Sequence, residues 1–167
     1  PGILAVVRTP DLSATPPIDG SLLVLDGVSD PGNVGTLIRT ATALGVGVVS
    51  IGGADPFGPK AVRASAGTCY RARIHRAEAL VDVAGALRAG GRPLLGLAAE
   101  GERTLHDVAE SIRGTGFVLV VGAEPDGIAA GARAALDGLV RIPMQGDVES
   151  LNVAAAGAIA LHTLSGR

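Results

Sequence analysis

Aromatic residues are scarce in this chain of 167 residues, which has one Tyr, two Phe and no Trp. The hydrophobic fraction is nevertheless 47%, so the core must be built from Val, Leu, Ile and Ala. A chain of this length and apolar content fits one folded domain with a sizeable core. Intrinsic disorder is excluded, because disordered chains are poor in apolar residues.

Cysteine is limited to Cys69, which excludes an internal disulfide and favours an intracellular, cytoplasmic protein. The histidines His75, His106 and His162 show no metal-ligand spacing with this cysteine, so we expect no metal site. No apolar run reaches the roughly 18 residues of a membrane span, and no signal peptide is visible. We therefore expect no association with a membrane.

An excess of basic charge is also missing, because 14 Lys and Arg face 16 Asp and Glu, a net charge of −2. This balance argues against a general nucleic-acid coat but leaves room for a local basic patch. One group of basic residues is close together in the sequence: Lys60, Arg63, Arg71, Arg73 and Arg76. A solvated face and a phosphate-binding patch are both open interpretations of this group.

Short β-rich apolar runs alternate with helical stretches along the chain. The predicted strands are Ile3–Val7, Leu22–Asp26, Gly47–Ile51, Ala72–His75, Pro93–Leu97, Phe117–Val121 and Leu139–Ile142. The predicted helices are Pro31–Leu44, Pro59–Ala66, Ala77–Ala89, His106–Ser111, Ala129–Leu136 and Ser150–Leu164. Apolar strands separated by helices indicate an α/β fold with a mostly parallel, buried sheet flanked by helices.

The first of these helices has a clear start, with Asp30 as the expected N-cap and Pro31 in the first turn. Its apolar residues recur at helical spacing, whereas Asn33 and Arg39 lie away from that face. An Arg on such a helix is usually a solvated charge. The neighbouring Asn33 and the glycine-containing turn before it favour a functional role here.

The last predicted helix begins beside three polar residues, Glu149, Ser150 and Asn152, and is otherwise almost entirely apolar. A helix start offers unpaired N–H groups and partial positive charge, so Ser150 is either a simple N-cap or part of a site. Asn152 lies just inside the predicted helix and needs polar partners if it is buried. The all-round apolar surface indicates burial under other elements or against a second subunit.

Three loops leave strands at their carboxyl ends, where open α/β sheets bind ligands. They begin after Asp26, at Gly122 and at Met144. Within the second loop Glu124 is either a helix-start cap or a site residue. None of the loops is a dinucleotide fingerprint or a Walker A loop. The residues alone therefore predict an α/β enzyme with a site near these side chains: Asn33, Arg39, Glu124, Ser150 and Asn152.

At these loops the sequence resembles the SpoU class of the SPOUT RNA methyltransferases. The three matching motifs are Asp30–Ala41, Val120–Ile128 and Ile142–Ala154, in the order the family has them. The resemblance extends over nearly the whole chain from about Leu22 onward. One departure is Ala123, where many relatives carry Asn, which could alter a contact to the cofactor or at an interface.

The resemblance implies a deep C-terminal trefoil knot, an exception to the rarity of knots. It also implies a homodimer that binds S-adenosylmethionine and methylates a ribose 2′-hydroxyl of rRNA or tRNA, with 23S rRNA favoured. By motif match the catalytic residues would be Asn33, Arg39, Glu124, Ser150 and Asn152. The cofactor would be held by Leu97, Gly122, Glu124, Ile142, Met144, Leu151 and Asn152.

The resemblance implies that Arg39 would activate the hydroxyl, although arginine essentially stays protonated. Either it binds an RNA phosphate and stabilises developing alkoxide, or it orients a phosphate or Glu124 that takes the proton. The segment Pro1–Val7 resembles the junction after an N-terminal RNA-binding domain, which we expect to be absent from this chain. Two alternatives to the enzyme are a catalytically silent RNA-binding relative and a nucleotide-dependent oxidoreductase.

Overall fold

The computed structural model describes residues 2, 6, 8, 9, 12, 20–123, 127–146 and 148–166. Its strands are β1 (Leu22–Asp26), β2 (Gly47–Ile51), β3 (Ile74–Ala77), β4 (Leu94–Leu97), β5 (Arg103–Thr104), β6 (Val118–Gly122) and β7 (Gly138–Arg141). They form one seven-stranded sheet in the order β3-β2-β1-β6-β4-β7-β5, and every neighbouring pair is parallel. The prediction of an α/β fold with a mostly parallel sheet is thus confirmed.

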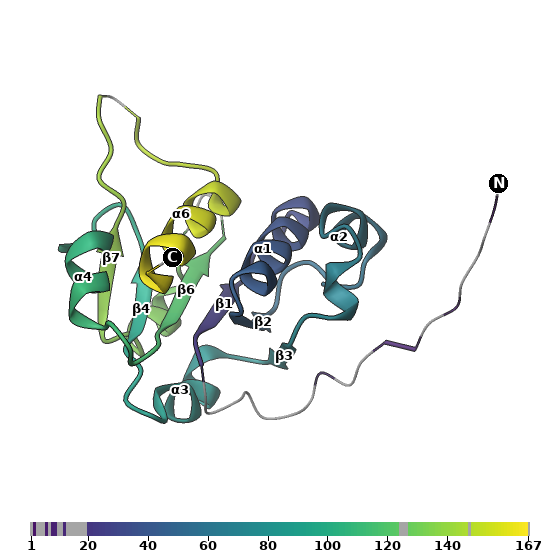
Figure 1. Ribbon diagram of the computed structural model, residues 1–167, viewed down its shortest axis with the longest axis horizontal. Helices are drawn as coiled ribbons and strands as arrows, with labels where there is room; N and C mark the ends of the chain where they lie inside the picture. Colours follow the sequence, from purple (N-terminus) through teal and green to yellow (C-terminus); the bar gives the residue numbers. More distant parts are fainter. Residues whose placement is uncertain are drawn as a thin grey trace.

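The helices cover both faces of the sheet. They are α1 (Pro31–Ala43), α2 (Pro59–Ala64), the 3-10 helix η1 (Thr68–Tyr70), α3 (Leu80–Arg88), α4 (Leu105–Ser111), α5 (Ala130–Arg133) and α6 (Val153–Ser165). Helices α1, α2, α4 and α6 share one core cluster with the sheet, and α3 and α5 share the other. Figure 1 shows α1 and α6 side by side over the middle of the sheet.

The central strands β1 and β6 are apolar on both faces because both faces are covered. Leu23 and Leu25 join the core under α1 and α6, whereas Leu22 and Val24 join the core under α3 and α5. Successive side chains of a strand point to opposite faces, so a continuous apolar run is what such a strand requires.

Two glycines let helices approach α1 closely. A Cβ at Gly35 would overlap the carbonyl oxygen of Ala61 and lie 2.7 Å from the Cβ of Ala64, so α2 packs directly on α1. A Cβ at Gly157 of α6 would overlap the side chain of Leu37 in α1. These contacts fix α2 and α6 on either side of α1.

Some predicted boundaries were wrong. Strand β3 begins at Ile74 and not at Ala72, because the Ala72 N–H still bonds to the Thr68 carbonyl in the turn after η1. It also continues through Ala77, so α3 starts later than predicted. Strand β5 was not predicted, since it has only two residues. The predicted strand Ile3–Val7 falls largely outside the described residues.

The part of the chain that the structure describes has no helix long and apolar enough to cross a membrane. The trefoil knot implied by the family resemblance stays a prediction.

Candidate active site

The predicted cofactor loops start from neighbouring strands, at the carboxyl ends of those strands. Strands β6, β4 and β7 lie next to one another, and Leu97 of β4 is in register with Val140 of β7. Gly122 ends β6 in register with Asp26, the last residue of β1. Leu97, Gly122 and Ile142 therefore leave three adjacent strands at their carboxyl ends, where parallel sheets bind ligands.

The first and third motifs meet through two asparagines. The Asn152 amide nitrogen donates a hydrogen bond of 3.1 Å to the side-chain oxygen of Asn33. The Asn152 oxygen accepts hydrogen bonds from the N–H groups of Ala154 and Ala155, at 2.9 and 3.3 Å. Asn152 thus caps α6 and at the same time ties this helix to the start of α1.

This arrangement corrects the predicted start of the last helix. The helix begins at Val153, so Asn152 is its N-cap and does not lie inside it. Ser150 is consequently not the cap, and it is exposed together with Glu149. Within the described residues neither Ser150 nor Glu149 has a side-chain partner. Both side chains are free to contact a ligand or substrate.

The start of α1 is held by Asp30. Its carboxylate accepts a 2.9 Å hydrogen bond from the Asn33 N–H, as the N-cap prediction required. Its other oxygen forms a 2.7 Å ion pair with Lys60 of α2. The hydrogen bond from Lys60, followed by that from the Asn33 N–H, holds the pKa of Asp30 below its usual value. The Asp30 cap thus orients Asn33, the residue that meets Asn152.

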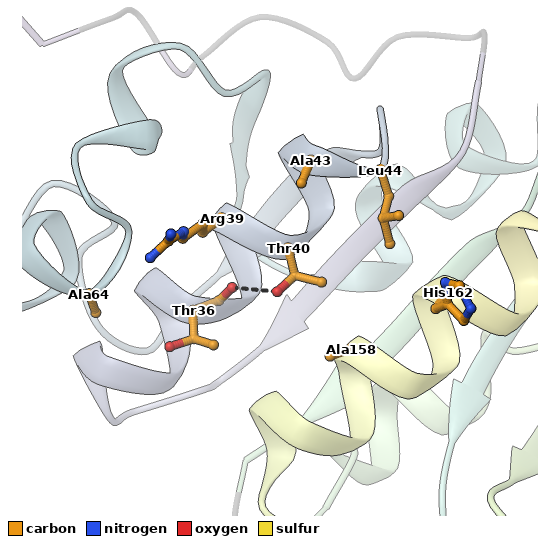
Figure 2. A pocket seen from close by; sticks show the side chains of 8 residues that line it. All are labelled: Thr36, Arg39, Thr40, Ala43, Leu44, Ala64, Ala158 and His162. Atoms are coloured by element: carbon orange, nitrogen blue, oxygen red, sulfur yellow. Dashed lines mark hydrogen bonds between the residues drawn. The ribbon is translucent and has the colours of Figure 1, made fainter. Parts of the chain in front are cut away.

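Arg39 lies away from the two asparagines. It is exposed and six residues beyond Asn33, about 9 Å farther along the helix axis at 1.5 Å per residue. It lines a hollow of about 510 Å³ together with Thr36, Thr40, Ala43, Leu44, Ala64, Ala158 and His162. Figure 2 shows its side chain pointing away from His162, toward the segment that carries Ala64.

The second motif loop is closed by its glycines. Gly127 donates a 2.6 Å backbone hydrogen bond to Ala123, and a Cβ at Gly122 would overlap Gly127. Glycine at 122 is therefore required for this close approach of backbone. The predicted site residue Glu124 lies outside the described residues.

The other predicted cofactor residues present partly exposed apolar surface. Leu97, Ile142, Met144 and Leu151 are all half-buried, so each offers some surface to a ligand. Leu97 and Ile142 pack on the core beneath α6. Met144 and Leu151 belong to the segment between β7 and α6, which Figure 1 shows projecting from the sheet.

Sequence reasoning missed Asp26, which ends β1 and is only 9% exposed. Its carboxylate accepts a 3.1 Å hydrogen bond from the Ala129 N–H, just before α5. The residue thereby anchors the chain that follows the second motif loop. A carboxylate directly after an apolar strand was the available signal. Among the described residues no three His, Cys, Asp or Glu side chains are grouped so that they could hold a metal ion.

The fold and the carboxyl-edge loops define an α/β protein whose candidate site joins its first and last motifs. Comparison with known proteins then gives the family. The model of the SpoU rRNA Methylase family matches residues 20–162, so the chain belongs to this family and the predicted resemblance is confirmed.

Two curated relatives are similar over most of the chain. The 23S rRNA (guanosine(2553)-2′-O)-methyltransferase RlmP of Bacillus subtilis is 35% identical over 147 residues, covering 87% of this chain and 58% of that protein. The 23S rRNA (guanosine-2′-O-)-methyltransferase RlmB of Xanthomonas campestris is 40% identical over 142 residues, covering 84% and 56%. The chain thus spans less than two thirds of the length of these relatives.

Solved structures agree with the fold. The SpoU methyltransferase AviRb from Streptomyces viridochromogenes in complex with AdoMet superimposes with a TM-score of 0.80 at 29% identity, covering 89% of this chain and 57% of that one. The AdoMet-bound rRNA methyltransferase from Sinorhizobium meliloti gives 0.81 at 32% identity, covering 94% and 60%.

Proposed function

We propose that this protein transfers a methyl group from S-adenosylmethionine to a ribose 2′-hydroxyl of RNA, with 23S rRNA as the favoured substrate and tRNA as the other. The observation that carries the proposal is the Asn33–Asn152 hydrogen bond, which joins the start of α1, in the first motif, to the start of α6, in the third. The names of the two relatives and the AdoMet in the two solved structures support it.

The residues around the three loops fit this cofactor. Half-buried Leu97, Ile142 and Leu151 offer apolar surface for an adenine ring, and Gly122 allows the backbone to approach a ligand closely. When bound, S-adenosylmethionine supplies an electrophilic methyl group on a sulfonium. Because nothing in this chemistry needs a metal, the proposal includes no metal site.

The chain's own residues would position the ribose and handle its proton. Asn152 and Asn33 fix the two motifs relative to each other, and Ser150 can hydrogen-bond the RNA. Positioning of this kind contributes on the order of 7–11 kcal/mol at best. Arg39 stays protonated, so its role is to bind a phosphate or stabilise developing alkoxide. The proton goes to an RNA phosphate or to Glu124.

A homodimer is part of the proposal. On α6 the exposed residues Ala155, Ile159 and His162 follow one another by about one helical turn, and Ile159 is 44% exposed. His162 also lines the hollow that contains Arg39, together with Ala158 of α6 and with Thr36, Thr40 and Ala43 of α1. A second copy seated there would cover this apolar stripe and bring Arg39 to the interface. We also propose the cytoplasm as the place where the enzyme meets its RNA.

The dimer is tested by light scattering at micromolar concentration. Ile159→Glu and Ala155→Arg add charge at exposed positions and should give folded monomers. Gly157→Arg is different, because any side chain there overlaps Leu37 and should prevent folding. A wild-type protein with the mass of a monomer would contradict the dimer.

The activity is tested on the full-length protein in two steps. Calorimetric titration should show saturable binding of S-adenosylmethionine, and total RNA from cells lacking the gene should accept a tritiated methyl group. The main alternative, a catalytically silent RNA-binding relative, predicts RNA binding with no transfer. The oxidoreductase alternative predicts binding of NAD in place of S-adenosylmethionine.

A further inference from the structure

The structure divides the five clustered basic residues into two groups. Three of them have intramolecular partners. Lys60 pairs with Asp30 at 2.7 Å, Arg76 pairs with Asp55 at 3.2 Å, and Arg73 donates a 3.1 Å hydrogen bond to the Gly45 carbonyl.

Arg63 at the end of α2 and Arg71 after η1 form the second group. Both are exposed, and neither side chain has a hydrogen-bond or ion-pair partner within residues 20–123, 127–146 and 148–166. Arginine stays charged, and its planar guanidinium matches a phosphate bidentately. Of the five basic residues, Arg63 and Arg71 are therefore the two that remain available to bind phosphate.

An exposed aromatic ring is the direct neighbour of Arg71 in the chain and follows Arg63 by seven residues. Tyr70, the last residue of η1, directly precedes Arg71 and is 41% exposed. Its ring lies 5.7 Å from the ring of Phe57, tilted by 43°. The neighbouring Cys69 is fully buried and anchors η1 in the core. Phe57 and Tyr70, two of the three aromatic residues of the chain, thus pack together, and Phe57 supports the exposed ring of Tyr70.

This α2–η1 surface, defined as Arg63, Tyr70 and Arg71, adjoins the hollow that contains Arg39. Ala64, the residue after Arg63, lines that hollow together with Arg39. Figure 2 shows the guanidinium of Arg39 directed toward the segment of Ala64. The close packing of α2 on Gly35 of α1 fixes the two elements relative to each other.

We propose that the α2–η1 surface docks a single-stranded segment of the RNA substrate, next to the nucleotide that is methylated. Arg63 and Arg71 bind backbone phosphates, and Tyr70 stacks on an unpaired base. This inference rests on the proposed function. A ring at the surface reaches only bases that are not stacked in a helix, so single-stranded RNA fits better than a duplex.

The binding test uses the full-length protein and fluorescence anisotropy with a short fluorescein-labelled oligouridylate. Tyr70→Ala should weaken binding about tenfold, and Tyr70→Phe should restore it, because stacking needs the ring and not the hydroxyl. The double variant Arg63→Gln with Arg71→Gln should lower the slope of log K against log salt by about 1.4, as expected for two phosphates on a single strand.

Arg113→Gln is the matched control. Arg113 is also an exposed arginine without a side-chain partner in the described part of the chain, but it follows α4, which packs on β5 and β7 near the opposite edge of the sheet. Melting temperatures of all variants show whether the fold is intact. Binding of the α2–η1 variants equal to that of Arg113→Gln would overturn the inference. An equal loss on a blunt RNA duplex would overturn the single-strand preference.

Methyl transfer separates this inference from the proposed function. The α2–η1 variants should raise the KM for total RNA about tenfold, with kcat and the affinity for S-adenosylmethionine within about twofold of wild type. No transfer by the wild-type protein would refute the proposed function. Normal transfer with unchanged KM in every variant would refute the docking surface alone.

Discussion

The two ends of the sheet use polar side chains in different ways. At the amino ends of the strands, Arg92 is 3% exposed and donates a 2.7 Å hydrogen bond to the Gly20 carbonyl. Asp137 accepts hydrogen bonds from the Leu94 N–H at 2.8 Å and from Arg88 at 2.9 Å. These side chains connect segments far apart in the sequence, so they stabilise the fold.

At the carboxyl ends, Glu149 and Ser150 are exposed and have no side-chain partner within the described residues. Arg39, farther along α1, is likewise exposed and has no such partner there. The Asn152–Asn33 hydrogen bond connects two motif segments there, and Asn152 remains exposed. The comparison indicates that polar groups at the amino ends act on stability, whereas those in the motif loops are available for a substrate. Substitutions at the two ends should therefore give different phenotypes.

The largest effect is expected from Arg39→Ala. Methyl transfer should fall about a hundredfold or more, because a charge that stabilises developing alkoxide is lost. The affinity for S-adenosylmethionine should stay within a few-fold and the melting temperature should not change, since Arg39 is exposed and away from the cofactor loops. Tritiated methyl transfer and calorimetry check this, with Arg113→Ala as the control. Full activity of Arg39→Ala would remove this residue from the catalytic role.

The second largest effect is expected on stability, at the amino ends of the strands. Arg92→Met should lower the free energy of unfolding by about 2–3 kcal/mol, because the carbonyls of Gly20 and Ala86 lose a charged donor. Urea denaturation measures the change, and the affinity for S-adenosylmethionine in the absence of urea should remain normal. A stability within about 0.5 kcal/mol of wild type, as expected for surface changes, would show that Arg92 does not stabilise the fold.

Asn152 contributes both to the stability of the fold and to the candidate site, so substitutions there should change stability and activity. Asn152→Ala removes the cap of α6, which costs about 1 kcal/mol of stability, and it should also reduce cofactor affinity and turnover. Asn152→Asp keeps an oxygen that accepts from Ala154 and Ala155 but loses the donor to Asn33, so it should lose less stability than Asn152→Ala while activity still falls. Unchanged stability of Asn152→Ala in urea would contradict the capping role.

The smallest effect is expected on the stability of the protein at acidic pH. The hydrogen bond from Arg88, and then that from the Leu94 N–H, hold the pKa of Asp137 below its ordinary 3.8. A lowered folded-state pKa gives stability that is present above the unfolded value and is lost as the pH falls through the folded value. Asp137→Asn should therefore cost under about 1 kcal/mol at pH 7, since the ion pair is partly exposed. Urea midpoints that still differ at pH 2 would contradict this linkage.

Much of the fold was predictable because its signals are local. Strands β1 and β2 have the predicted bounds, since each is a mostly apolar run with Gly or Asp at its ends. The start of α6 was not predictable to the residue, because Ser150 and Asn152 are both good caps and tertiary contact with Asn33 favours the second. Strand β5 has too little sequence to be recognised, and its pairing with β7 defines it.

The candidate site was predictable in its residue types and less so in its geometry. Asn33 and Asn152 were both singled out, but their direct hydrogen bond joins positions 119 residues apart and has no local signal. Tyr70 was not identified, because only the packing of η1 shows that its ring is supported by Phe57 and exposed. The separation of Arg39 from Asn33 follows from helix geometry alone.

We propose that the carboxyl-end loops, together with Arg39, perform S-adenosylmethionine-dependent methylation of a ribose hydroxyl. The most direct measurement is mass spectrometry of nucleosides from RNA of cells lacking the gene, treated with the full-length protein and deuterated S-adenosylmethionine. The label is expected in one 2′-O-methylated nucleoside, at a rate about a hundredfold or more lower with Arg39→Ala. Label on a base, or no label although the protein binds S-adenosylmethionine, would contradict it.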